Sequence, residues 1–406
     1  MREPEPNPKV VSSRVHLPQL DGVRGLAILL VLACHFVSFQ SVRGEVVGQV
    51  IDAVAGHGFL GVDLFFVLSG FLITGILYDT RGTGHFFKYF YARRMLRICP
   101  LYYAYILAVC AALGLVLLRR GHDPLFARAL GDGGWAAAYL TNVEIALKGS
   151  NVTFIFNHFW SLAVEEQFYL VWPLLVFCMT RQQLKVFCAV LILSAAGLRC
   201  LAHGSGWQAV ASYLLPCRTD SLAMGALVAL AARDASEWKT VSAAAGYVLV
   251  TGLAALIVCM YGAWPLRDEL LYTAASLAFA GLLVKAVAAP PGTGIFAVFG
   301  SRFLGTFGKY SYGLYVVNQP IAFFPGFGKL RDWLTVHLHS RAAAGVLYAA
   351  VGIGLSFAVA FLSWHLLEKR MLRLKRHFET APKPVPAPGA SFPELGEADV
   401  LTPSSN

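Results

Sequence analysis

The sequence predicts an all-α integral membrane protein, a polytopic bundle of about ten transmembrane helices with both termini in the cytosol. Of its 406 residues, 57% are hydrophobic and only 14% are charged, whereas soluble domains are usually about half apolar and a quarter charged. Apolar runs recur along the chain at lengths approaching the roughly 20 residues that a spanning helix needs. The lysines and arginines lie mainly between these runs, which is typical of membrane topology rather than of a nucleic-acid-binding surface.

The first expected span follows a polar arm that carries several basic residues, and it is too closely followed by further spans to be a cleaved signal peptide. We expect flanking residues to extend the shorter runs. Ten crossings return both termini to one side, and the positive-inside tendency makes that side cytosolic. The expected spans lie at residues 26–39, 59–78, 100–118, 161–179, 186–202, 219–232, 241–264, 268–288, 310–325 and 342–366.

A further short apolar stretch, residues 134–147, contains Asn142 and Glu144. If it crossed the membrane, the basic cluster from Lys369 to Arg376 would lie outside, against the positive-inside tendency. We therefore expect a re-entrant or interfacial helix there.

We expect the chain to divide into a cytosolic arm (1–16), a transmembrane domain (17–377) and a cytosolic tail (378–406). The tail is rich in Pro, Glu, Ser and Gly, and its low apolar content predicts disorder. The eight cysteines form no CxxC pair and no zinc-like spacing, so we expect packing residues and no metal site.

An ionisable residue inside a spanning helix costs on the order of 2.5–3.5 kcal/mol, so such residues indicate where function resides. His35 lies eleven residues after Arg24, which places it about 16 Å deeper, near the middle of the membrane. A neutral imidazole there can act as a base. The alternative is a core histidine hydrogen-bonded to a neighbouring helix, with Arg24 and Asp21 at the membrane boundary.

Two further segments carry charge near the spans. In the second, Asp63 and Ser69 interrupt an apolar helix, and Asp63 either holds a histidine or arginine in position or lies in water at the outer interface. In the third, Arg94 and Arg97 are three residues apart on one helical face, which suits the phosphates of a large anionic donor. The alternative for the arginines is a topological anchor.

A fourth segment begins a span on the outer side with His158, Trp160, Glu165, Glu166 and Tyr169. The aromatic rings offer stacking faces to a sugar. The helix macrodipole accounts for one of the two glutamates but hardly for both.

Other polar positions are Arg218, Asp220, Asn318 and Glu368. Arg218 with Asp220 is also readable as a local ion pair, and Glu368 as a partner of the adjacent cytosolic bases.

In this order, the segments resemble the acyltransferase 3 family of membrane O-acyltransferases, from about residue 17 to residue 375. Each string is weak alone, but the ordered set is specific. One departure is Asn318, where many relatives carry a histidine. The strings are LDGVRG with His35 eleven residues after Arg24, GVDLFFVLSGFLIT, the Arg94 and Arg97 pair before Pro100, FWSLAVEEQFYLVWP, RTDSLAMG, SYGLYVVNQP and SWHLLEKR.

The resemblance implies an O-acetyltransferase that moves an acyl group, most often acetyl, from cytosolic acyl-CoA to a hydroxyl of a carbohydrate-containing acceptor such as peptidoglycan, lipopolysaccharide or another glycolipid. It implies that His35 is the essential catalytic histidine and that Arg24, Arg94 and Arg97 hold the donor. The donor is a co-substrate, no cofactor is bound permanently, and the protein lies in the cell (inner) membrane.

We assign the remaining candidates by position. Glu165 joins His35 as a catalytic residue, and Asp21, Asp63 and Ser69 support the site. The mechanism is either direct transfer with His35 as general base or passage through an acyl-histidine. The acceptor side is expected to include Trp160, Glu166, Tyr169, Arg218, Asp220 and Asn318.

Two rival functions remain at this point. One is a transporter or flippase for a lipid-linked sugar, since many spans with buried charge also describe such proteins. The other is an inactive scaffold in a polysaccharide assembly complex, against which the presence of both Arg24 and His35 counts.

Overall fold

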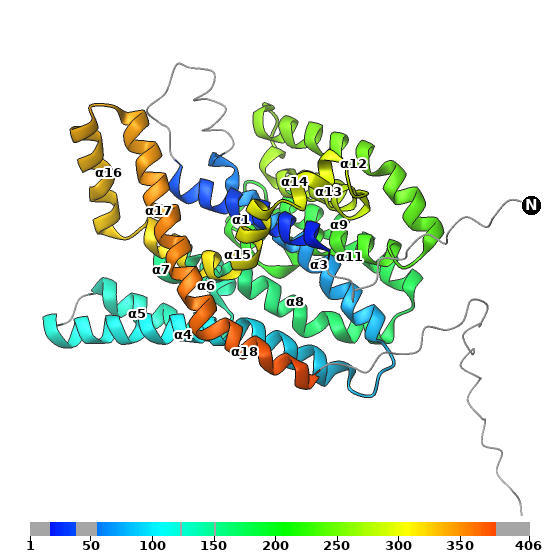
Figure 1. The fold of residues 1–406 in the computed structure, drawn as a ribbon, viewed down its shortest axis with the longest axis horizontal. Helices are drawn as coiled ribbons and strands as arrows, with labels where there is room; N and C mark the ends of the chain where they lie inside the picture. Colours follow the sequence, from blue (N-terminus) through cyan, green and yellow to red (C-terminus); the bar gives the residue numbers. More distant parts are fainter. Residues whose placement is uncertain (1–16, 38–54, 122–123, 150–151, 379–406) are drawn as a thin grey trace, which may run out of the picture.

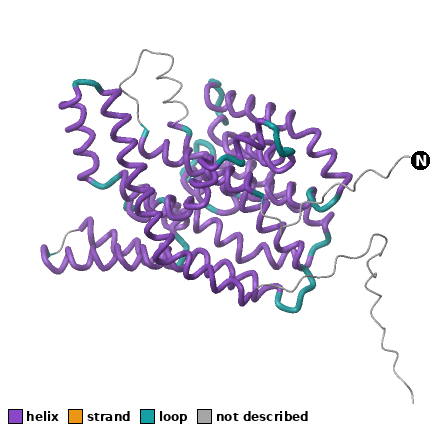
Figure 2. Tube along the Cα trace, viewed as in Figure 1, coloured by secondary structure: helices purple, strands orange, loops and turns teal. Residues whose placement is uncertain are grey.

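A computed structural model describes residues 17–37, 55–121, 124–149 and 152–378. Within these ranges every regular element is a helix (Figures 1 and 2). This confirms the all-α class. The expected arm 1–16 and residues 379–406 of the expected tail lie outside the described residues, whereas Phe378 ends a short helical turn.

The helices follow one another along the described chain. The first half of the chain forms α1 (Pro18–Phe36), η1 (Gly58–Leu60), α3 (Gly61–Thr80), α4 (Phe86–Arg120), α5 (Pro124–Ala137), α6 (Thr141–Lys148), α7 (Phe154–Asn157), α8 (Phe159–Cys178) and α9 (Arg181–Ala202). The second half forms α10 (Gln208–Tyr213), η3 (Leu215–Cys217), α11 (Thr219–Ala231), α12 (Ala235–Tyr261), α13 (Arg267–Ala288), α14 (Gly294–Phe299), α15 (Arg302–Ala322), α16 (Pro325–Leu338), α17 (Arg341–Ser363), the π-helical turn η4 (Trp364–Glu368), α18 (Lys369–Arg373) and η5 (Leu374–Phe378).

Eight helical segments of the described chain are long and apolar enough to cross a membrane. They correspond to eight of the expected spans and show an integral membrane protein. The expected spans at 219–232 and 310–325 form α11, with 13 residues, and α15, with 21 residues, which are not among these eight. The eight segments are 18–36, 58–80, 86–119, 154–178, 181–202, 235–261, 267–288 and 341–378.

Helix boundaries differ from expectation at several places, and two of these differences concern the expected topology. Helix α4 begins at Phe86 rather than near residue 100, because the basic and aromatic segment before Pro100 is itself helical. Pro100 lies within the helix, as membrane helices tolerate. The stretch 134–147 is not one helix, since α5 ends at Ala137 and α6 starts at Thr141. Neither helix reaches the roughly 20 residues of a span.

Glycines let the central helices meet at their backbones. A Cβ on Gly70 of α3 would lie 1.9 Å from the carbonyl oxygen of Leu222, and one on Gly225 of α11 would lie 1.8 Å from that of Val67. A Cβ on Gly308 of α15 would lie 1.9 Å from the carbonyl oxygen of Asp21 in α1. These contacts hold α3 against α11 and α1 against α15, since small residues permit close helix approach in membranes.

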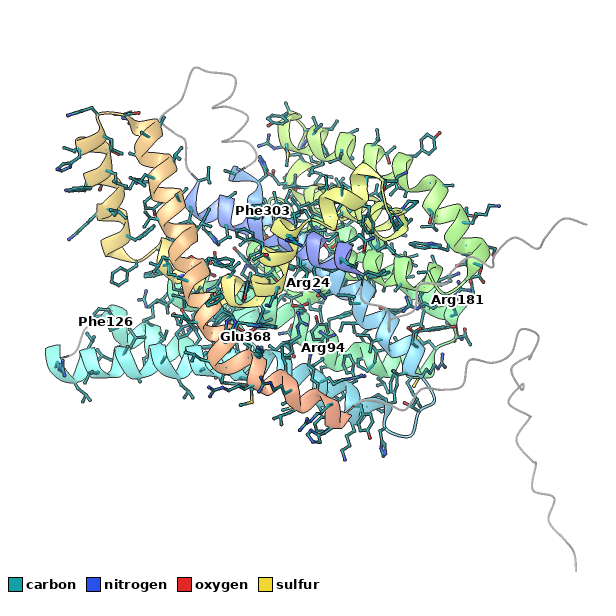
Figure 3. The ribbon with its side chains drawn as sticks, in the orientation of Figure 1. Arg24, Arg94, Phe126, Arg181, Phe303 and Glu368 are labelled. Atoms are coloured by element: carbon teal, nitrogen blue, oxygen red, sulfur yellow. The ribbon has the colours of Figure 1, made fainter. Side chains whose placement is uncertain are left out.

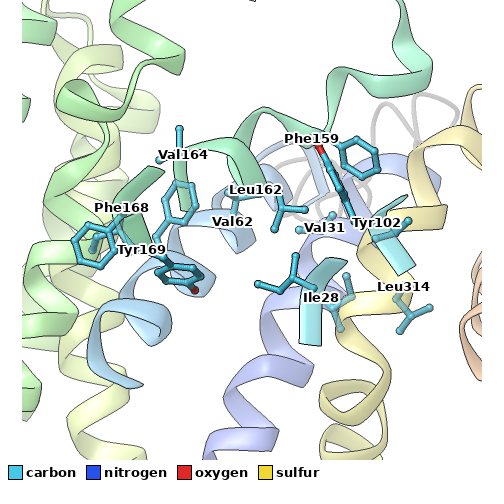
Figure 4. Close-up of a cluster of buried hydrophobic side chains, with 14 of the residues drawn as sticks. Ile28, Val31, Val62, Tyr102, Phe159, Leu162, Val164, Phe168, Tyr169 and Leu314 are labelled. Carbon is cyan, nitrogen blue, oxygen red and sulfur yellow. The ribbon is translucent and has the colours of Figure 1, made fainter. Parts of the chain in front are cut away.

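The main apolar core lies among these helices and α8. Figure 4 shows part of it, with Ile28 and Val31 of α1 facing Leu162 of α8 and Leu314 of α15. Tyr169 of α8 belongs to the same cluster.

Candidate active site

A cavity of about 840 Å³, counting the solvent at its mouth, lies between α1, α3, α4, α8 and α15. It draws charged and hydroxyl-bearing side chains from helices far apart in the sequence. Its polar lining consists of Arg24, Ser69, Arg94, Arg97, Ser161, Glu165, Tyr169, Ser311, Tyr312 and Tyr315.

The three arginines expected to bind the donor share this cavity. Figure 3 shows Arg24 on α1 and Arg94 on α4 near the middle of the molecule. Arg24 donates a 2.5 Å hydrogen bond to Asp21, and the Arg94 guanidinium lies 5.4 Å from the centre of the Tyr169 ring. Arg97 makes no hydrogen bond to any other residue of the described ranges. Three cations against one lining carboxylate leave this wall positive, which favours an anionic ligand.

Glu165 is that carboxylate, and it is held by two hydroxyls. Ser69 of α3 and Tyr169, one turn later on α8, both donate hydrogen bonds to it. Ser69, expected in a supporting role, is therefore placed beside Glu165. Tyr169, expected on the acceptor side, lies instead between Glu165 and Arg94.

His35 lies in the last turn of α1, because that helix runs from Pro18 to Phe36. A proline at the first helical position fixes φ for the helix start, so Arg24 is already well inside the helix rather than at its mouth. The expected place of Arg24 at the mouth of the helix is therefore wrong.

The partner of His35 is Asn318 of α15. The ring Nδ1 is hydrogen-bonded to the Asn318 Oδ1, and Phe323 meets the imidazole edge-on with 6.1 Å between ring centres. His35 is not among the residues that line the cavity. Tyr315, which does line it, lies one turn before Asn318 on α15, so His35 is about one helical turn beyond the cavity wall.

The wall between the cavity and His35 contains a second imidazole, His158. The Tyr315 hydroxyl lies 2.5 Å from the Ser161 hydroxyl and donates to the His158 carbonyl. The His158 Nε2 donates to the Val316 carbonyl at 3.0 Å, which leaves its buried Nδ1 with no partner in the described structure. The motif that contains His158 drew attention to this residue, but its contact with α15 was not foreseeable.

Three residues expected at the acceptor side or in support form a separate buried cluster. Asp63 is fully buried and accepts a 2.8 Å hydrogen bond from Arg218, so its placement in interfacial water is wrong. Asp220 pairs with Arg199 at 2.7 Å, so the local Arg218–Asp220 ion pair is wrong too.

Arg218 also lies against three aromatic rings, 3.8 Å from the centre of Tyr272, 5.4 Å from that of Trp160 and 6.0 Å from that of Phe66. Neither Trp160 nor Arg218 lines the cavity. Arg199 was not among the predicted site residues. An arginine within an expected span, here 186–202, is nevertheless a sequence feature that indicates a buried charge.

The chain was compared with known proteins. The model of the acyltransferase 3 family, described as an acyltransferase domain, matches residues 17–365. This chain belongs to the acyltransferase 3 family. The resemblance drawn from the ordered motifs is thus confirmed, and the match covers most of the expected domain, 17–377.

Two curated relatives of this acyltransferase 3 chain are named as O-acetyltransferases. It is 27% identical to the peptidoglycan O-acetyltransferase OatA of Listeria monocytogenes over 88% of this chain and 56% of that protein. It is 29% identical to the O-acetyltransferase OatA of Staphylococcus aureus, strain NCTC 8325, over 82% of this chain and 54% of that protein. The chain therefore spans about half the length of these relatives. No solved structure matches it.

Two acidic residues of the family motifs lie beside the site without lining the cavity. Glu166 follows Glu165 in the chain, but one of its carboxylate oxygens is buried with no hydrogen-bond partner in the described structure. Glu368 ends the π-helical turn η4 and accepts a 2.9 Å hydrogen bond from Ser363, not from the neighbouring bases (Figure 3). Such π turns occur often at functional sites.

Proposed function

We propose that this acyltransferase 3 chain is a membrane O-acetyltransferase that moves an acetyl group from cytosolic acetyl-CoA to a hydroxyl of a carbohydrate acceptor. Peptidoglycan is the first acceptor class to test, because a relative bears it in its name. Acyl-CoA acts as co-substrate, and no cofactor is bound permanently. The observation that carries the proposal is the cavity in which Arg24, Arg94 and Arg97 meet Glu165, one helical turn from His35.

The proposal includes ten crossings in the cell (inner) membrane. If the eight candidate spans, together with α11 and α15, cross in alternating directions, the chain makes ten crossings. With the N-terminus in the cytosol, α1 runs from Arg24 near the inner face to His35 near the outer face. The same alternation returns the chain to the cytosol at the basic segment 369–376, as the positive-inside tendency favours.

On this topology the donor enters from the cytosol. Arg24, Arg94 and Arg97 bind its phosphates, for which arginine is well suited by its planar array of donors. The acyl-bearing arm then extends along the cavity past Glu165 toward Tyr315. Because Tyr315 and Ser161 separate the cavity from His35, the proposal requires this hydroxyl pair to move when the donor binds.

The acceptor approaches from the outer face. Its hydroxyl proton passes to His35 as the oxygen attacks the thioester carbonyl, the new O–C bond forms, and the C–S bond breaks. The departing thiolate takes up the proton from the protonated His35, which gives free CoA and restores the neutral imidazole. Glu165 offers a hydrogen-bond acceptor within the cavity, while the aromatic ring of Trp160 and the Arg218 cluster lie on the acceptor side.

The test is transfer of covalent label by the purified chain in proteoliposomes. With acetyl-labelled acetyl-CoA on the cytosolic side and a peptidoglycan fragment or lipid-linked precursor on the other, we expect labelled, alkali-sensitive acceptor ester. Label that stays on CoA while the sugar changes sides identifies a transporter and contradicts the proposal.

A further inference from the structure

Asn318 is buried, 1% exposed, with every polar group of its side chain engaged. Its amide nitrogen donates to the carbonyls of Leu314 at 2.9 Å and Tyr315 at 2.8 Å. Two carbonyl acceptors require the NH₂ group at that position, so they settle which end of the amide is oxygen. The Oδ1 atom therefore faces the His35 Nδ1, to which it is hydrogen-bonded.

This orientation determines the tautomer of His35. An amide oxygen can only accept, so the hydrogen atom between the two side chains belongs to the His35 Nδ1. A neutral imidazole carries a single N–H. The lone pair that can take up a proton is consequently on Nε2.

The surroundings contain no competing partner for Nδ1 in the described structure. Phe323 meets the ring edge-on, and the Cys34 thiol precedes His35 on α1. His158, which precedes α8, has its own N–H committed to the Val316 carbonyl. No carboxylate of the described chain is hydrogen-bonded to His35, so the orienting group is a neutral amide.

We propose that Asn318 is a positioning residue that holds His35 with its proton on Nδ1, so that Nε2 is the atom that receives the acceptor's hydroxyl proton. The proposal rests on the proposed function and deepens it. Asn318, which was predicted from the sequence to lie on the acceptor side, is thereby assigned to the catalytic histidine. Orientation of a catalytic imidazole through its second nitrogen is the role that aspartate has in serine hydrolases.

The test compares two substitutions in the full-length chain in proteoliposomes. Asn318→Leu removes the acceptor at similar volume and allows either tautomer. We expect kcat to fall about 10- to 100-fold, the usual effect of losing an orienting partner of a functional histidine, with the donor KM unchanged. Asn318→Asp keeps an oxygen toward Nδ1, so it should retain more activity than Asn318→Leu.

The pH–rate profile separates positioning from a packing role. A carboxylate at 318 stabilises the protonated imidazole, so in Asn318→Asp the limb on which activity rises should move to higher pH. A residue that only fills space would leave that limb in place. This readout also serves if Asn318→Leu folds poorly, because aspartate has nearly the same shape as asparagine.

Gln319→Leu is the matched control. Gln319 is the next amide on α15, is 8% exposed, and donates to the Phe154 carbonyl at 3.3 Å without contacting His35. Its rising limb should remain that of the wild type. Provided that His35→Ala is inactive, either of two results overturns the inference. One is a rising limb of the pH–rate profile in Asn318→Asp that matches the wild type. The other is a wild-type kcat in folded Asn318→Leu. Full activity of His35→Ala would instead defeat the proposed function itself.

Discussion

Arg97 has the clearest unfilled role among the cavity side chains. It lies with Arg24 and Arg94 on the lining, yet no described residue accepts a hydrogen bond from it. A guanidinium in that condition is suited to a ligand's phosphate. Ser161 and Tyr315 bring hydroxyls to the same cavity, so under the proposed function the phosphate and acyl ends of the donor would meet different polar groups.

We predict that Arg97→Ala raises the donor KM about 10- to 100-fold, since a hydrogen bond to a charged group contributes about 1.5–3 kcal/mol. Maximal rate at saturating donor should change much less. Initial rates across a range of acetyl-CoA concentrations measure both values. Arg93→Ala is the control, because Arg93 neighbours Arg94 but does not line the cavity and donates instead to the Tyr89 carbonyl. Equal donor KM in the two variants would confine Arg97 to topology.

Much of this residue-level site was predictable, because charge inside an apolar helix is rare and visible in the sequence. The predicted residues that meet in one cavity are Arg24, Arg94, Arg97, Ser69 and Glu165. Their partners were not predictable. Nothing in the spacing indicates that Asp63 reaches Arg218, or that Asn318 reaches His35, because these contacts depend on how helices distant in sequence pack.

At the scale of helices, the contact between α3 and α11 leaves no room for side chains. We predict that Gly225→Ala lowers stability by about 1–3 kcal/mol or more, the usual cost of overpacking, because its Cβ would overlap the Val67 carbonyl oxygen. Thermal unfolding in detergent measures the change.

Gly114→Ala is the matched control on α4. A Cβ there meets nothing within 4 Å, so alanine should be neutral or stabilise by about 0.5–1 kcal/mol through its helix propensity. Equal melting temperatures for Gly114→Ala and Gly225→Ala would refute the close packing of α3 and α11.

The short helices α5 and α6 carry a buried acidic pair outside the spans. Asp132 accepts hydrogen bonds from the Thr153 N–H at 2.8 Å and hydroxyl at 2.7 Å, and these outweigh burial and lower its pKa. Burial raises the pKa of Glu144 to about 7, against the opposing effect of its 2.6 Å hydrogen bond from Lys148. Glu144 therefore holds a proton in the folded protein at pH values where an unfolded chain has lost it.

This difference gives a pH dependence of known sign. Because the folded pKa of Glu144 is above its ordinary 4.5, its contribution to stability falls as pH rises from about 4.5 to about 7 and then stays low. We predict that Glu144→Gln gains on the order of 1–3 kcal/mol relative to wild type between pH 5 and pH 8. Melting temperatures across that range test it.

The control for this comparison is Asp268→Asn at a carboxylate that is 70% exposed. It should keep the wild-type pH dependence. If Glu144→Gln and wild type differ by the same amount at pH 5 and pH 8, Glu144 does not titrate as described.

The positions of the helices were predictable from the apolar runs of the sequence, but several helix boundaries were not. Helix α4 extends before Pro100 because a basic and aromatic segment is as able to be helical as an apolar one, although hydropathy alone does not register it. Residues 134–147 divide into two helices at Tyr139, which has a positive φ of 54°. Such a conformation is uncommon for tyrosine and has no sequence signal at that position.

For the whole molecule, composition and the order of motifs were sufficient to predict the membrane bundle and the family, because lipid leaves few architectures available to a helical chain. The structure adds the order in which the proposed site residues lie along one helix. Arg24 and His35 share one helix, so under the proposed function the donor and the base lie along one path across the protein.

The central claim is that His35 is the base for acetyl transfer to a sugar hydroxyl. The most direct measurement is single-turnover transfer of acetyl label in proteoliposomes by wild type and His35→Ala, each first loaded with saturating acetyl-CoA. We predict that His35→Ala folds, binds acetyl-CoA with wild-type affinity and transfers no label to the acceptor above background. Transfer by His35→Ala at the wild-type rate would contradict the account.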